Sequence, residues 1–173
     1  MDLLEILNID SSRYTVDVAT EAVGSDPARF SEVFDHCFSQ PYPVSMRAAR
    51  VVQFCCERYP DLIYPHLEES FEKMLQSKVE GVKRGFLKIY AENIDLKRFT
   101  DPGALVSLCF EWLADPEEAI SVRVYALDIL YRYSELEPDL LNELASLLES
   151  LLYDGSTAIR SRARDRLKRI YKR

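Results

Sequence analysis

The residues that could support acid–base or nucleophilic chemistry are few in this chain of 173 residues. His36 and His66 are its only histidines, and Cys37 directly follows His36, which places a thiol beside a base in the sequence. Adjacent residues of a helix do not face each other, so this pair does not predict a nucleophile with its general base. The sequence contains no HExxH motif, no glycine-rich phosphate loop and no Gly-x-Ser-x-Gly elbow. It therefore predicts no catalytic residues and no enzyme activity.

The sequence predicts no metal site, no cofactor-binding residue and no cofactor. Its carboxylate clusters are typical of solvated helix faces and helix starts: Glu68, Glu69, Glu72, Asp115, Glu117 and Glu118. The cysteines lack the paired spacing of metal ligands, and each lies on or beside an apolar stripe. We expect free, reduced and buried thiols at Cys37, Cys55, Cys56 and Cys109.

An apolar residue followed by arginine or lysine recurs four times along the chain. The four pairs are Met46-Arg47, Val82-Lys83, Val122-Arg123 and Ile159-Arg160, and their spacings are 36, 40 and 37 residues. Self-similarity at this period predicts stacked helical hairpins, each of which buries its apolar face only against its neighbours.

Apolar residues spaced three and four apart predict a helix around each of these basic residues. Similar spacing predicts helices before or between them at 27–39, 62–75, 104–113 and 140–152, and two earlier ones near 3–7 and 15–23. We therefore expect ten helices, no strand and an all-α fold, a right-handed α-α superhelix of about four to five antiparallel helix pairs.

The turns between these segments carry glycines, capping side chains and first-turn prolines, as in Gly24-Ser25-Asp26-Pro27. No segment has the composition of a linker. The sequence predicts a single helical repeat domain over 1–173, with degenerate helices at 1–24 and repeats at 27–59, 61–95, 101–135 and 138–173.

The second helix of each predicted pair resembles the HEAT-type and armadillo-like helical repeats. The resemblance is clearest at 121–127 (SVRVYAL) and 158–163 (AIRSRA), and in the acid six residues before each arginine. It implies a structural ladder of hydrogen bonds between adjacent repeats, built from Glu117 with Arg123 and Asp154 with Arg160. The first two repeats depart from this pattern, because Pro41 and Ser77 occupy the acidic position. The resemblance implies a fold and a habit of binding macromolecules rather than a reaction.

A protein partner is the leading expectation for function. Second helices usually line the inner face of such a solenoid, and the positions one, five and eight residues after each basic residue form a stripe. That stripe includes Ala48, Val52 and Cys55 in the first full repeat. Tyrosine suits a contact surface because it combines an apolar ring with a hydrogen-bonding end. The candidate partner-binding residues are Arg84, Lys88, Tyr125, Tyr131 and Arg132.

The charge of the chain is concentrated at one end. Residues 156–173 carry a net charge of +7 on a chain whose total is −7, which leaves −14 on the rest. We expect an exposed basic strip of Arg162, Arg166, Arg169 and Arg173 on a helix anchored by Ile159, Ala163, Leu167 and Ile170.

Two roles of this basic strip stay open. It is either a polar cap on the repeat array or a site for nucleic acid, an acidic protein or an anionic surface. The acidic remainder of the chain disfavours nucleic acid as the partner, and a role as the regulatory subunit of an enzyme is a further alternative. The oligomeric state is not predicted.

No apolar run approaches the length that crosses a bilayer, and the first residues lack the basic start of a secretory signal. We therefore expect a cytoplasmic protein that does not enter a membrane.

Overall fold

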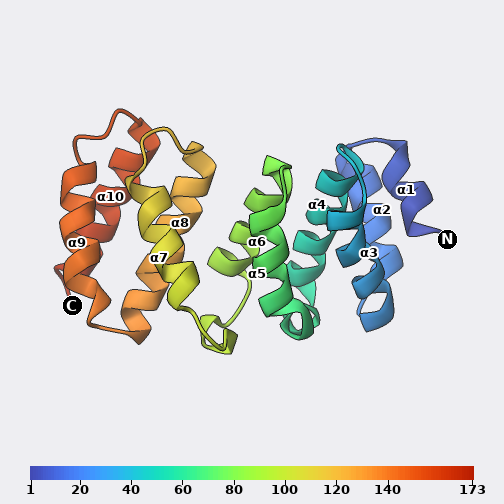
Figure 1. The fold of residues 1–173 in the computed structure, drawn as a ribbon, viewed down its shortest axis with the longest axis horizontal. Coiled ribbons are helices and arrows are strands. Elements are labelled where there is room, and N and C mark those ends of the chain that lie inside the picture. The colour runs from blue at the N-terminus through green and yellow to red at the C-terminus, as the bar shows by residue number, and fades with distance from the viewer. The chain divides into compact units, whose positions relative to one another are not determined.

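The computed structural model describes residues 1–173 and is built from ten α-helices and three short 3-10 turns, without a strand. The all-α prediction and the count of ten helices are therefore confirmed. The residues group into two compact units, 1–99 and 100–173, within which the helices run in adjacent pairs (Figure 1). The predicted repeats 27–59 and 61–95 lie in the first unit, and 101–135 and 138–173 in the second; a single 1–173 domain stays a prediction.

The first unit contains six helices and the second contains four. In the first unit these are α1 (Leu3–Ile9), α2 (Arg13–Val23), α3 (Pro27–Ser39), α4 (Val44–Arg58), α5 (Leu67–Gln76) and α6 (Glu80–Glu92). The second unit consists of α7 (Gly103–Ala114), α8 (Ile120–Leu136), α9 (Leu140–Leu151) and α10 (Thr157–Ile170). No helix is long and apolar enough to cross a membrane.

Local sequence fixes where several helices begin and end. Before α3, the Asp26 carboxylate accepts a hydrogen bond from the Ala28 amide at 2.9 Å, and Pro27 occupies the first helical position. Gly24 ends α2 with a φ of 55°, a left-handed conformation that glycine adopts without a Cβ penalty. The predicted helix at 62–75 begins only at Leu67, because Pro60 and Pro65 lie in two 3-10 turns.

Aromatic side chains fill the core of the first unit. Phe34 of α3 meets Phe86 of α6 edge to face, with 5.9 Å between ring centroids, and Phe38 stacks on the same ring at 5.4 Å. Tyr90 is completely buried, and its hydroxyl lies 2.5 Å from the Ser70 hydroxyl of α5. The core therefore connects α3, α5 and α6 through large rings and one satisfied polar pair.

The second helices of the first unit pack closely side by side. A Cβ at Gly85 of α6 would lie 3.4 Å from the Cβ of Ala49, and one at Gly81 would lie 2.5 Å from Cγ of Met46. The residue numbers of these contacts increase together, from Met46 with Gly81 to Ala49 with Gly85. The helices α4 and α6 therefore run in the same direction, as successive second helices of a repeat array do.

The second unit has its own core between two helix pairs. The anchoring residues predicted for the last helix, Ile159, Ala163, Leu167 and Ile170, are all buried, which confirms that prediction. They face an apolar interior that α7, α8 and α9 complete with Leu105, Leu113, Val122, Ala126, Ile129, Leu144 and Leu148.

Candidate functional site

A buried arginine joins the two helix pairs of the second unit. Arg123, in the first turn of α8, is only 2% exposed, and its Nε donates to the Leu113 carbonyl at the end of α7 at 3.1 Å. Its two terminal nitrogens donate to both carboxylate oxygens of Asp154, at 2.6 and 3.3 Å. These bonds hold the pKa of Asp154 below its usual value. The Arg123 guanidinium thus connects α8 to α7 and to the loop before α10.

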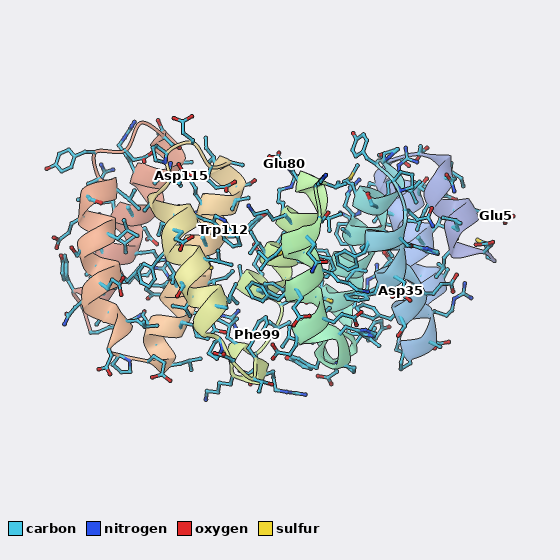
Figure 2. All side chains as sticks on the ribbon, viewed as in Figure 1. Glu5, Asp35, Glu80, Phe99, Trp112 and Asp115 are labelled. Carbon is cyan, nitrogen blue, oxygen red and sulfur yellow. The ribbon has the colours of Figure 1, made fainter.

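The predicted pairing of Arg123 with Glu117 is wrong. Glu117 lies in the turn after α7, where its amide donates to the Asp115 carboxylate at 2.9 Å; Figure 2 shows Asp115 in that turn. The acid that Arg123 uses comes from the following repeat, because the first turn of α8 points its side chain towards the loop between α9 and α10. The second predicted pair is formed through the backbone: Arg160 donates to the Asp154 carbonyl at 2.5 Å rather than to its carboxylate.

The corresponding arginine of the first unit plays a similar part. Arg47 of α4 donates to the Leu7 carbonyl in α1 at 2.9 Å and to the Ser11 hydroxyl at 2.8 Å. Both Arg47 and Arg123 therefore satisfy a carbonyl near the C-terminal end of an earlier helix, where backbone acceptors lack helical partners. This shared geometry supports a structural role for the repeated basic position.

The structure distributes the predicted partner-binding residues over both units. Arg84 is exposed on α6, and Lys88 lies one turn further along, with its Nζ 4.0 Å from the Glu92 carboxylate. Tyr125, Tyr131 and Arg132 are half-buried on α8. The predicted residues thus form two groups, one on α6 of the first unit and one on α8 of the second unit.

The stripe expected on α4 is not a surface. Ala48, Val52 and Cys55 are fully buried in the core of the first unit, where α2, α3 and α6 all pack against α4. The accessible face of α4 instead carries Arg50 and Phe54, with the Arg13 guanidinium from α2 lying 4.2 Å above the Phe54 ring. Sequence reasoning missed this face, although a charged residue, Arg50, in the predicted second helix was a signal for it.

The basic strip of α10 is largely tied to α8, so the prediction of an exposed strip is wrong for part of it. Arg162 and Arg166 both donate to the Asp128 carboxylate, at 2.7 and 3.1 Å, and the Arg166 side chain is only 17% exposed. Arg173 lies 3.4 Å from the Glu135 carboxylate. Arg169 remains more exposed and pairs with Asp165 of its own helix at 3.2 Å.

Tyr131 is the centre of this contact. The guanidinium groups of Arg166 and Arg173 each lie 4.8 Å from the centroid of its ring. No pairing role was predicted for Asp128 and Tyr131, because their spacing of three residues on α8 becomes informative only once α10 lies alongside.

Comparison with protein families agrees with this geometry, since the model of the HEAT repeat domain matches residues 4–170. The chain belongs to the HEAT repeat family. Searches of curated proteins and of solved structures returned no match. HEAT repeats are typical of non-enzymatic scaffolds that mediate protein interactions.

The thiols of this HEAT repeat chain are buried, as predicted, and unpaired. Burial raises the pKa of the Cys55 thiol to about 12 and that of Cys37 further still. Cys37 directs its Sγ to the Val33 carbonyl at 3.5 Å, whereas the Nε2 of His36 lies 4.0 Å from the Glu32 carboxylate. The neighbouring thiol and imidazole therefore do not form a catalytic pair.

A hollow of about 740 Å³ lies in the first unit. It is lined by the end of α3, where Figure 2 labels Asp35, and by Ser45, Lys73 and the residues that lead into α6. No group of three or more histidine, cysteine or carboxylate side chains is placed to hold a metal ion.

Proposed function

We propose that this HEAT repeat chain is a non-enzymatic protein-interaction module that holds a partner protein on the surface of its second helices. One observation carries the proposal. Arg84 projects from α6 into solvent with no acidic group in ion-pair contact, and Lys88 follows one turn later. The opposite face of α6 packs into the core, so Arg84 and Lys88 project from a helix that is held rigidly in place.

Three half-buried residues of α8 support the same function. Tyr125, Tyr131 and Arg132 combine apolar rings with hydrogen-bonding and charged ends, the composition that is enriched at protein interfaces. The contacts of Arg162 and Arg166 with Asp128 support a protein partner over a nucleic acid, because both cations already bind a carboxylate within the chain. The four unpaired thiols support a cytoplasmic location, where thiols stay reduced.

Affinity purification from the native host followed by mass spectrometry tests the proposal. The wild-type chain is compared with Arg84→Glu/Lys88→Glu and with Lys78→Glu/Lys97→Glu, a control with the same change of charge at exposed residues of the same unit. We expect a protein that the wild type and the control retain and that the α6 variant loses.

Two results would contradict this function. Retention of the same partner by all three proteins would remove α6 from the interface. Recovery of nucleic acid that resists physiological salt, with no specific protein, would favour the polyanion alternative.

A further inference from the structure

The cations of α10 divide into two opposite flanks. Arg162, Arg166 and Arg173 lie on the flank that faces α8, where Asp128 and Glu135 accept them. The other flank carries a second set, Arg164, Lys168 and Lys172, all exposed and none with an acidic group in ion-pair contact. The predicted strip of Arg162, Arg166, Arg169 and Arg173 includes the first flank, whereas the second flank was not predicted as a site and is exposed.

Two members of the second set lie one turn apart on α10. Arg164 and Lys168 are four residues apart on the helix, and Lys172 lies in the turn that follows its last residue, Ile170. The neighbouring residue Tyr171 bonds the Glu149 carboxylate of α9 through its hydroxyl, which shows that this side of α10 adjoins α9.

An apolar row of α9 borders the cations. Leu147 and Ser150 line a hollow shared with Phe110 of α7, which identifies the flank of α9 that faces α7. The opposite flank carries Leu141, Ala145 and Leu152, which are half-buried beside the fully buried Leu144 and Leu148. The flanks of α9 and α10 that turn away from α7 and α8 therefore form one face with an apolar row and a basic row.

We propose that this α9–α10 face docks an acidic amphipathic helix of a partner protein. A helix that carries carboxylates at every fourth residue presents them about 6 Å apart, which is the rise along α10 from Arg164 to Lys168, and Lys172 follows in the turn after the helix. Apolar residues on the adjoining stripe of such a helix would cover Leu141, Ala145 and Leu152. This surface belongs to α9 and α10, whereas Arg84 and Lys88 lie on α6 and Tyr125, Tyr131 and Arg132 lie on α8, so it is a site additional to the proposed function.

Charge complementarity favours a narrow acidic helix over a nucleic acid. The basic row is one residue wide, and exposed carboxylates lie on both sides of it, Glu149 on α9 and Asp165 on α10. A DNA duplex is far wider than this row, so its phosphates would come within a Debye length, about 8 Å, of these carboxylates. A single helix can place all its acids on the row and avoid that repulsion.

Fluorescence anisotropy with the full chain tests the proposal. The probe is a short labelled helical peptide with glutamates at every fourth position beside a leucine row, and its control is a scrambled peptide of the same composition. The variant Lys168→Glu/Lys172→Glu is matched by Lys78→Glu/Lys97→Glu, which replaces two equally exposed lysines of the first unit. We expect the α10 variant to weaken binding of the patterned peptide by about tenfold or more, and the control variant to bind as the wild type does.

Three results would overturn the proposal: equal binding of the scrambled peptide, equal loss in both variants, or tighter binding of a labelled DNA duplex than of the patterned peptide. If circular dichroism shows that the α10 variant has lost helix, Lys168→Gln/Lys172→Gln replaces it, because glutamine removes the charge without adding repulsion and favours helix nearly as well. Unchanged binding in that folded variant would likewise overturn the proposal. The affinity purification with Arg84→Glu/Lys88→Glu tests the α6 surface separately. A negative result for one surface therefore leaves the proposal for the other surface open to its own test.

Discussion

Arg123 carries a permanent charge into the interior of the second unit. Removing a guanidinium from water costs several kcal/mol, which the bidentate contact with Asp154 and the bond to the Leu113 carbonyl offset. Arg160 differs because its side chain is partly exposed and binds one carbonyl and the Thr157 hydroxyl. The two arginines occupy the same position of the repeat, but we expect them to contribute different amounts to the free energy of unfolding.

We expect Arg123→Ala to lower the free energy of unfolding by about 3 kcal/mol, because it leaves the Asp154 carboxylate without its main partner. Arg160→Ala should cost about 1 kcal/mol, the value of an ordinary hydrogen bond. Urea denaturation followed by circular dichroism measures both, with Arg164→Ala as an exposed control that should change little. Equal costs for Arg123→Ala and Arg164→Ala would refute the structural role of the buried arginine.

Acid should weaken the same contact. The pKa of Asp154 is lower in the folded than in the unfolded chain, chiefly because Arg123 donates to its carboxylate. Its contribution to stability is therefore present above the unfolded pKa, about 3.9, and is lost as the pH falls through the folded pKa.

We expect the stability of Asp154→Asn to lie below that of the wild type near neutral pH, and the difference to shrink between about pH 5 and pH 2. Urea midpoints across this range provide the measurement. A difference that stays constant with pH would mean that the carboxylate charge does not contribute.

At the scale of the helix, much of the fold could be predicted and the details of its surfaces could not. The apolar spacing of three and four located all ten helices, and the bounds of α3 agree with the predicted 27–39. The accessible face of α4 was missed because neighbouring helices cover Ala48 and Val52, and the apolar period of one helix does not reveal which of its faces the neighbours cover. The partner of Arg123 was missed for a related reason, since Asp154 belongs to another helix pair.

The close contact of α4 with α6 should tolerate no branched side chain at Gly85. A Cβ there already meets the Cβ of Ala49 at 3.4 Å, so the two methyl groups of valine have no space without a shift of the helices. We expect Gly85→Val to destabilise the chain by about 2 kcal/mol in thermal or urea unfolding. Gly155→Val is the control, because no atom lies within 4 Å of a Cβ at Gly155. Equal stabilities of the two variants would contradict this packing.

The contact between α10 and α8 predicts that charge reversal lowers the free energy of unfolding by different amounts along the basic strip. Arg166→Glu would place a second carboxylate beside Asp128 at a position that is largely covered, whereas Arg169 is more than half exposed. We expect Arg166→Glu to cost about 1 to 2 kcal/mol more than Arg169→Glu, and added salt to reduce the difference. If both variants lost the same free energy of unfolding at low salt, the contact of Arg166 with Asp128 would not stabilise the packing of α10 on α8.

At the scale of the whole molecule, the two units carry separate cores with different chemistry. The first unit is packed with aromatic rings from α3 and α6, and the second is packed mainly with leucine, isoleucine, valine and alanine. The buried arginine and its carboxylate belong to the second unit alone. Changes at Arg123 and at Gly85 therefore act on different cores, and their effects on each unit can be followed separately.

The buried thiols make that distinction measurable without any engineered label. Cys37, Cys55 and Cys56 lie in the first unit and Cys109 in the second, each at most 1% exposed. A thiol reagent reaches them only when the surrounding helices open, so the rate of alkylation reports the opening of each unit. We expect Arg123→Ala to accelerate modification of Cys109 far more than that of Cys55, and Gly85→Val to do the reverse. Mass spectrometry of the alkylated peptides would thus record, from one sample, how often each half of the chain opens to solvent.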